Sequence, residues 1–204
     1  MAKTQTRRKD TRQRIQDTAL ELFLEHGYEK TSLREIAERL DVTKAALYYH
    51  FKTKEDIVLS LFDRLGTALD ELITWAEERP PTLDTRRELL RRLNETLAGS
   101  ASLFRFLQEN QAALRDMRPG EDFRDRMKSL GSLMAEPEAD MVGRIRSISA
   151  LFTVYFGGFA LADMEGTMEE KRAALFQVAD EMLTAAHAQE AARAQKAEPA
   201  RKSD

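Results

Sequence analysis

Residues 31–54 have the sequence TSLREIAERLDVTKAALYYHFKTK, which predicts two short helices joined by a tight turn. In the first helix, apolar residues recur every three to four positions, at Leu33, Ile36, Ala37 and Leu40. Ser32 can cap this helix, with Glu35 completing a capping box, and Thr43 can cap the second helix. Between the helices, Asp41 tolerates turn conformations. The stretch therefore predicts a helix pair whose starts are well defined.

The second helix of this pair has an unusual outward face. Successive residues turn by about 100°, so Leu47 and Phe51 share one face while Ala45 and Tyr49 lie nearly opposite. Small residues allow a helix to enter a major groove deeply, and a tyrosine can contact a thymine methyl group or a phosphate. Together with the charge of Lys44, this face favours a DNA-recognition helix. In a competing interpretation, the helix uses its ring side chains to close a three-helix core: Tyr48, Tyr49 and His50.

A pattern of apolar, aromatic, capping and charged residues extends with fixed spacing across three helices of the N-terminal region. Its members are Phe23, Gly27, Thr31 or Ser32, Ile36, Ala37, Val42, Thr43, Leu47, Tyr48, His50, Phe51, Lys54 and Glu55. With this pattern, about the first 60 residues resemble the N-terminal domain of the TetR family of transcriptional regulators. Members of the family often have a glycine or a serine-glycine pair early in the second helix of the pair. This chain differs there, because it carries Lys44, Ala45 and Ala46.

The resemblance implies an all-α protein with an N-terminal three-helix DNA-binding domain and a larger helical domain for ligand binding and dimerisation. We expect the DNA-binding domain, with a basic N-terminal arm, at residues 1–54, the second domain at 55–192 and a disordered tail at 193–204. The expected DNA-binding residues are Thr31, Ser32, Arg34, Thr43, Lys44, Ala45, Tyr48, Tyr49, His50 and Lys54.

The charge distribution agrees with DNA binding at the N-terminal end. Residues 1–54 contain 12 Lys and Arg against 8 Asp and Glu, whereas residues 55–204 contain 20 against 27. A basic end on an acidic chain is expected when phosphates are met only there. The basic residues of the arm can reach a groove or phosphates, or remain solvated: Lys3, Arg7, Arg8, Lys9, Arg12 and Arg14.

Periodicity and punctuation predict helices throughout the chain. We expect a first helix at 10–26, a long helix from Thr53 to before Pro80, and further helices near 83–97, 101–117, 120–134, 138–163 and 168–192. The helix at 138–163 is apolar on more than one face, and Gly157 and Gly158 within it suggest close approach of another backbone. In the resembled family, the last two helices pair with their copies in a dimer. The residues expected at such an interface are Ile148, Phe156, Gly157, Gly158, Leu175, Val178 and Met182; the alternative is that both helices complete a monomeric core.

An effector pocket is expected among the apolar side chains of the second half. The candidates are Trp75, Phe104, Phe106, Met134, Phe152, Tyr155 and Phe159, although aromatic residues and Met at helical spacing also form ordinary cores. This composition favours a lipophilic or aromatic effector.

The sequence lacks the motifs of several other functional classes. It has no cysteine and only three histidines, His26, His50 and His187, at spacings that fit no metal site. It has no phosphate-binding loop, dinucleotide motif or hydrolase nucleophile motif. We therefore expect no cofactor, no metal and no enzymatic activity. The longest uncharged stretch has 16 residues, fewer than a bilayer helix needs, and no secretion signal is evident, so we expect a cytoplasmic protein without membrane contact.

The leading hypothesis is a homodimeric regulator, acting as a repressor, that leaves a palindromic double-stranded DNA operator when an unidentified small molecule binds. A second hypothesis is a DNA-binding protein without small-molecule control, whose C-terminal half only dimerises or binds a protein partner. A third is a helical enzyme that carries the same three-helix element.

Overall fold

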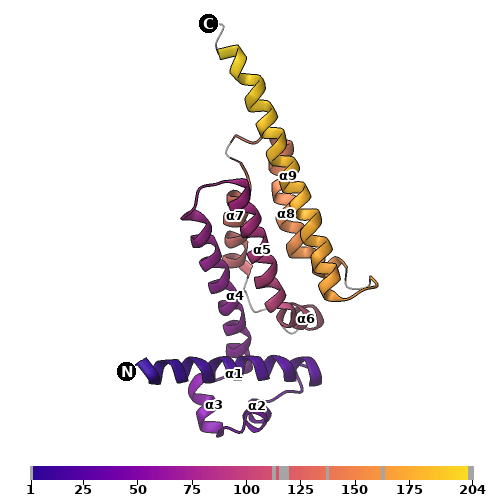
Figure 1. Ribbon diagram of the computed structural model, residues 1–204. Coiled ribbons are helices and arrows are strands. Elements are labelled where there is room, and N and C mark those ends of the chain that lie inside the picture. Colours follow the sequence, from indigo (N-terminus) through magenta and orange to yellow (C-terminus); the bar gives the residue numbers. More distant parts are fainter. Residues whose placement is uncertain (1, 112–113, 115–119, 137, 162–163, 202–204) are drawn as a thin grey trace. The chain divides into compact units, whose positions relative to one another are not determined.

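The computed structural model describes residues 2–111, 114, 120–136, 138–161 and 164–201, and within them all regular secondary structure is helical. The helices are α1 (Ala2–His26), α2 (Leu33–Arg39), α3 (Lys44–His50), α4 (Lys54–Glu77), α5 (Leu83–Gly99), α6 (Ala101–Glu109), α7 (Gly120–Met134), α8 (Met141–Ala160) and α9 (Met168–Arg201) (Figure 1). The described residues form two compact units, one of residues 1–67 and 99–121 and the other of residues 68–98 and 122–204. The all-α class with an N-terminal helix-turn-helix element is confirmed.

The first unit is built around α1, with α2 and α3 on the same side of it (Figure 1). The apolar stripe of α1 includes Ile15, Leu22 and Phe23, which are almost completely buried. Ile36 from α2 and Leu47 from α3 complete this core. Gly27 ends α1 with φ +91° and donates its backbone N–H to the carbonyl oxygen of Phe23, as expected for a helix stop. Local sequence signals thus fix the helices that carry the DNA-recognition face.

Helices α4 and α6 also contribute to the first unit. The side chain of Gln16 in α1 donates hydrogen bonds to the hydroxyl and the carbonyl oxygen of Ser60 in α4, at 2.8 and 3.0 Å. Phe106 of α6 stacks on Phe23 with ring centroids 5.4 Å apart, and lies 5.9 Å from Tyr28. A segment that follows α5 in the chain therefore forms part of the N-terminal unit.

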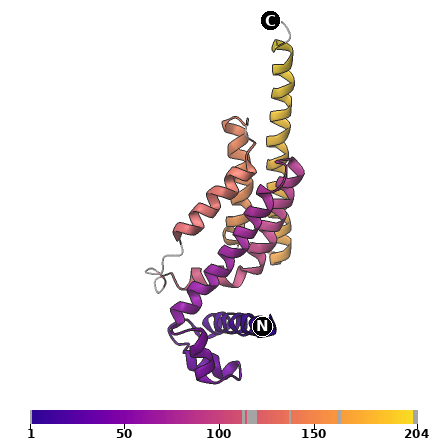
Figure 2. The ribbon, with the colours of Figure 1, turned by 90° about the vertical axis from the view of Figure 1, so that its left-hand side faces the viewer.

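In the second unit, α8 and α9 pack side by side along their length (Figure 1 and Figure 2). Its core consists mainly of aliphatic side chains from five helices: Leu72, Leu89, Leu90, Leu93, Leu130, Met134, Ala150, Leu151, Val154, Ala179, Leu183 and Ala186. Polar links also tie its helices together. Arg87 of α5 donates to Asp180 and Thr184 of α9, each at 2.8 Å, and Arg126 of α7 forms a bidentate pair with Asp70 of α4.

Three helix ends differ from the expected ones by more than three residues. Helix α1 begins at Ala2 rather than near residue 10. Helix α6 ends at Glu109, because the side chain and backbone amide of Asn110 both donate to the carbonyl oxygen of Phe106. Helix α9 continues to Arg201, through the segment where a tail is expected. Residues 188–198 are rich in Ala, Gln, Glu, Lys and Arg, which are good helix formers.

Gly157 lies where α8 closely approaches α9 of the same chain. A Cβ atom at this position would lie 2.2 Å from Cδ2 of Leu175, too close for any real contact. The sequence predicts that another backbone approaches this glycine closely. A close approach is present, but the neighbouring group is the side chain of Leu175 from the same chain. Gly158 belongs to α8, although its surroundings are outside the described residues, as are those of Phe159.

We expect Gly157→Ala to lower the thermal stability of the protein. Alanine normally stabilises a helix by about 1 kcal/mol relative to glycine, but overpacking against Leu175 should cost about 1–3 kcal/mol. Adding Leu175→Ala should restore part of the loss, because the obstructing side chain is removed. Thermal unfolding of the single and double variants measures both effects. A stabilised single variant would contradict this packing.

Candidate nucleic-acid interface

The turn between α2 and α3 is held by local hydrogen bonds. The Ser32 hydroxyl accepts from the amide of Glu35 at 3.2 Å, and the Thr43 hydroxyl accepts from the amide of Ala46 at 3.1 Å, which confirms both expected caps. The Glu35 carboxylate lies 2.6 Å from Nδ1 of His26. Asp41 adopts φ 52°, a left-handed conformation that Asp tolerates better than most residues. These contacts set the direction in which α3 leaves the turn.

Helix α3 buries one face and exposes the other. Leu47 is completely buried, and Phe51, directly after the helix, is 2% exposed. On the opposite side, Tyr49 is 63% exposed, and Lys44 and Ala45 are exposed with it. This is the arrangement expected from the helical period. The exposed face is narrow near the helix start and carries a ring farther along, so it can enter a groove and contact base edges.

The borders of this face carry basic and aromatic groups. The ammonium group of Lys44 lies 5.4 Å from the ring centroid of Tyr48, which is half-buried. The rings of Tyr49 and half-buried His50 meet edge to face at 5.3 Å. Lys52 is exposed after the helix and donates from Nζ to the carbonyl oxygen of Tyr48 at 2.6 Å. Lys52 is absent from the expected site residues, although its position beside a recognition helix is a usable sequence signal.

Arg12 links α1 to the end of the recognition helix. Its guanidinium lies 4.3 Å from the ring centroid of Phe51, and its Nη1 donates to the carbonyl oxygen of His50 at 3.3 Å. The expectation that Arg12 belongs to a free basic arm missed this contact, because residues 38 positions apart give no local signal. The side chains of residues 1–9 are outside the described part of the chain.

Two of the expected DNA-binding residues point into the domain. Thr31 is buried, and its hydroxyl donates to the carbonyl oxygens of Gly27 and Leu22 at 2.9 and 3.2 Å. Lys54 donates from Nζ to the carbonyl oxygen of Tyr28 at 2.6 Å and lies 4.4 Å from the ring centroid of Tyr28. Burial, together with a hydrogen bond donated to Glu55, raises the pKa of the Tyr28 hydroxyl. Lys54 thus contacts the loop between α1 and α2, which leads directly into the helix-turn-helix element.

Two other expected DNA-binding residues, Ser32 and Arg34, lie at the cap of α2 and on α2. Both are exposed. Arg34 forms an ion pair with Glu38 one turn later, at 2.7 Å. A surface pair of this kind contributes little to stability, so the arginine can exchange it for a phosphate.

The expected effector residues are divided between the two units. Phe104 and Phe106 belong to the first unit, where Phe106 is buried against Phe23 and Tyr28. The other described candidates belong to the second unit: Trp75, Met134, Phe152 and Tyr155. Of these, Met134 is fully buried, and Tyr155 contacts Phe123 at 5.3 Å between ring centroids. Trp75 is half-buried between the guanidinium groups of Arg79 and Arg92, at 4.4 and 4.2 Å.

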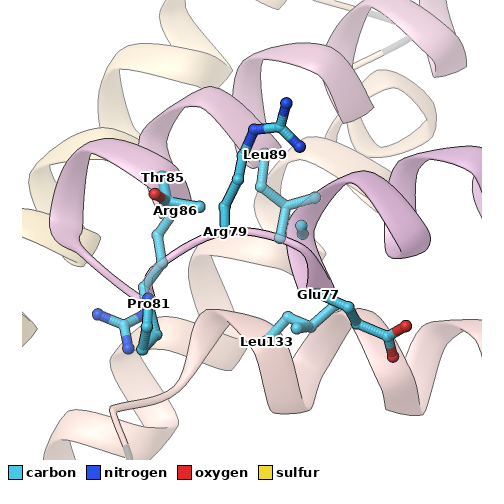
Figure 3. Close-up of a pocket in the computed structure, with 8 residues that line it drawn as sticks. Glu77, Arg79, Pro81, Thr85, Arg86, Leu89 and Leu133 are labelled. Atoms are coloured by element: carbon cyan, nitrogen blue, oxygen red, sulfur yellow. The ribbon is translucent and has the colours of Figure 1, made fainter.

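The second unit contains a cavity of about 280 Å³ where α4, α5 and α7 meet (Figure 3). Its apolar lining consists of Ala76, Pro81, Leu89 and Leu133, and its polar lining of Glu77, Arg79, Thr85 and Arg86. The expected effector residues are not among these side chains.

Several expected dimer residues form an exposed apolar surface on α8 and α9. Ile148, Phe156 and Val178 are exposed, and Leu175 and Met182 are half-buried. On α8 the exposed side chains continue in both directions at helical spacing, giving Met141, Ile145, Ile148, Phe152 and Phe156. We call these five residues the α8 stripe.

No described helix is both long and apolar enough to cross a bilayer. Among the residues with described positions, no group of three or more His, Cys, Asp or Glu side chains is arranged to hold a metal ion.

The three N-terminal helices, with a capped turn and an exposed α3 face, define a DNA-binding domain of the helix-turn-helix class. Residues 15–61 match the sequence model of the bacterial regulatory proteins of the tetR family. Residues 15–61 thus correspond to the N-terminal DNA-binding domain of that family.

Relatives with assigned names are similar over part of the chain. The transcriptional regulator AcrR of Shigella flexneri is 38% identical over 90 residues, which are 43% of this chain and 42% of AcrR. TtgR of Pseudomonas putida is 29% identical over 137 residues, 58% of this chain and 65% of TtgR. A probable acrEF/envCD operon repressor of Escherichia coli is 32% identical over 83 residues, 39% of this chain and 38% of the repressor. The chain spans about half the length of these relatives, whose names are those of regulators rather than enzymes.

Solved structures extend the similarity of fold to most of the chain. A TetR/AcrR-family regulator from Thermobifida fusca has a TM-score of 0.59 and 26% identity, and covers 84% of this chain and 97% of its own. A regulator from Aquifex aeolicus has a TM-score of 0.64 at 24% identity, with 82% and 96% covered. At 24% identity, the similarity to the Aquifex aeolicus regulator concerns the fold alone.

Proposed function

We propose that this protein is a homodimeric transcriptional regulator that binds a palindromic operator and releases it when a small molecule binds. The exposed face of α3 carries the proposal. Tyr49, Lys44 and Ala45 lie outward on a helix whose other face is anchored by Leu47, and a helix of this kind suits a major groove. The name of the Escherichia coli relative, an operon repressor, supports repression. Binding to an operator would require the protein to be in the cytoplasm.

Within this proposal, DNA contacts come from the α3 face and its borders. Lys44, Ala45, Tyr49 and His50 face or border the groove, and Ser32, Arg34, Thr43 and Tyr48 contact the backbone. Lys54 and Thr31 act indirectly, by fixing the loop before α2 through their hydrogen bonds. Residues 1–54 supply these contacts, residues 55–192 supply the effector and dimer surfaces, and residues 193–204 are left without a role.

The α8 stripe supports dimerisation. Five large apolar side chains exposed on one helix are unusual for a monomer, and such a patch is typical of a protein interface. A two-fold dimer would pair the stripe with its own copy. It would also present two copies of α3, which suits half-sites separated by about 34–36 Å on DNA.

Effector control requires a ligand that binds the DNA-free form more tightly. A tenfold preference corresponds to about 1.4 kcal/mol of coupling per site. The cavity at the end of α4 is a suitable site, because the same helix begins directly after the recognition element, at Lys54. Coupling is reciprocal, so operator DNA would weaken effector binding by the same factor.

Selection of bound duplexes from a random pool tests this function. A dimeric regulator should enrich an inverted repeat whose half-sites lie about one helical turn apart. Enrichment of a single unrepeated site, or of no sequence at all, would contradict the proposal.

A further inference from the structure

The cavity of the second unit combines an apolar lining with a buried arginine. Leu89 and Leu133 form part of the apolar lining. In Figure 3, the guanidinium group of Arg86 lies beside Pro81, whereas the carboxylate of Glu77 points away on the other side. A ligand in this space would therefore meet hydrocarbon surface and one buried cation.

Arg86 has hydrogen-bonding capacity that the chain does not use. The residue is 2% exposed, and Nη1 donates to the Glu136 carboxylate while Nη2 lies 3.4 Å from the carbonyl oxygen of Ala135. Its Nε is buried and has no hydrogen-bond partner among the residues that the structure describes. A buried donor without a partner is rare in proteins, because its lost hydration is not replaced. Turning the side chain slightly toward the cavity would bring Nε to a ligand acceptor and remove this cost.

The unused edge of Arg86 is suited to a carboxylate. Nε and Nη2 of an arginine form a planar fork that matches two carboxylate oxygens. Arg126 uses this fork within the same unit, donating from Nε and Nη2 to the two oxygens of Asp70 at 2.7 and 2.8 Å. On Arg86, the same edge has no partner at Nε and only a long contact at Nη2.

The carboxylate that Arg86 contacts is shared with a second side chain. Glu136 accepts from Arg86 and also lies 2.9 Å from Nδ1 of His187, so one carboxylate is shared between two donors. Arg79 adds a second cation to the lining, and Glu77 is exposed to water. The shared carboxylate therefore leaves Arg86 able to attract a second anion.

We propose that this cavity binds a small organic acid, whose carboxylate accepts hydrogen bonds from Arg86 and whose apolar body packs on Leu89 and Leu133. The inference rests on the proposed function, because it assigns a chemical class to the effector. A volume of about 280 Å³ is at the lower end for ligand pockets, which favours compact acids over long-chain ones.

Fluorescence titration of the 204-residue protein with benzoate and octanoate tests the proposal. Trp75 is the single tryptophan, and the guanidinium stacked on it belongs to Arg79, a cavity residue. We expect saturable changes in Trp75 emission with either acid. Benzamide and octanamide, which keep the shape and lose the charge, should bind at least about tenfold more weakly, a factor that corresponds to 1.4 kcal/mol.

Arg86→Gln should weaken acid binding at least tenfold and leave amide binding nearly unchanged. Arg87→Gln is the matched control, because Arg87 lies next in α5 but pairs with Asp180 and Thr184. If Arg86→Gln fails to fold, Leu133→Phe is the deciding variant, since it narrows the cavity from a half-buried position, leaves Arg86 and Glu136 in place and keeps Trp75 as the single tryptophan. We expect it to abolish binding of both acids. Wild-type acid affinity in a folded Arg86 or Leu133 variant would overturn the proposal.

Operator affinity, measured with and without benzoate or octanoate, separates this inference from the proposed function. Lack of saturable binding of both acids up to about 10 mM, or equal affinity for acids and amides, overturns the acid site and leaves the DNA-binding function intact. Acid binding that depends on Arg86 but leaves operator affinity unchanged supports the site and contradicts ligand control.

Discussion

Replacing Tyr49 with alanine should reduce operator affinity strongly while the protein remains as stable as wild type. Tyr49 is 63% exposed on the recognition face, and its ring meets that of His50 edge to face. Loss of a base contact costs about 1–3 kcal/mol, and the dimer loses it twice. Because the residue is exposed, the free energy of unfolding should change by less than about 0.5 kcal/mol. Fluorescence anisotropy with the selected duplex and thermal unfolding measure the two quantities.

Two further tyrosine variants provide controls. Tyr49→Phe keeps the ring, so it separates contact with a thymine methyl group from hydrogen bonding by the hydroxyl. Tyr28→Ala should have the opposite signature, with a large loss of stability, because Tyr28 is buried and donates to Glu55 at 2.9 Å. If Tyr49→Ala destabilised the protein and left operator affinity intact, Tyr49 would belong to the core rather than to the DNA contact.

If the protein is the proposed dimer, Phe156→Asp should convert it to a monomer and weaken operator binding in parallel. Phe156 is 51% exposed on the α8 stripe and stacks on Phe152 at 5.6 Å, so it would be buried only when a second copy covers the stripe. Burying an unpaired carboxylate in an interface costs several kcal/mol, enough to dissociate most dimers at micromolar concentration. Sedimentation velocity over a concentration series measures the shift.

Leu59→Asp is the control for this substitution. Leu59 is also an exposed large apolar residue, but it lies on α4 in the first unit. The same change there should leave the oligomeric state unaltered. A Phe156→Asp protein that sediments as wild type does would show that the α8 stripe does not form the dimer.

The recognition element could be predicted because its determinants are local. The caps at Ser32 and Thr43 and the burial of Leu47 opposite Tyr49 depend on residues within one or two helical turns. Hydrophobic periodicity and capping residues report such contacts directly. The positions of Thr31 and Lys54 could not be derived in this way. Lys54 bonds to a carbonyl 26 residues earlier, and no short motif encodes that contact.

Long-range contacts also decide which side chains of the second unit line the cavity. Its apolar residues identified core helices, but periodicity cannot tell which apolar side chain borders a cavity. Arg86 appeared in the sequence as one of many charged residues of α5, and its burial depends on Glu136, 50 positions away. Phe106 was expected near an effector and instead packs with Phe23 in the first unit. Long-range pairings of this kind follow from the folded chain and not from local spacing.

The most direct test of the account is the affinity of the wild-type protein for its selected duplex and for the same duplex with one half-site scrambled. If two α3 helices bind the two half-sites, scrambling one half-site should weaken binding at least about 100-fold at fixed salt, because one α3 helix loses its base contacts and each mismatched base pair costs about 1–3 kcal/mol. Equal affinity for the two duplexes would contradict recognition by two α3 helices of a dimer.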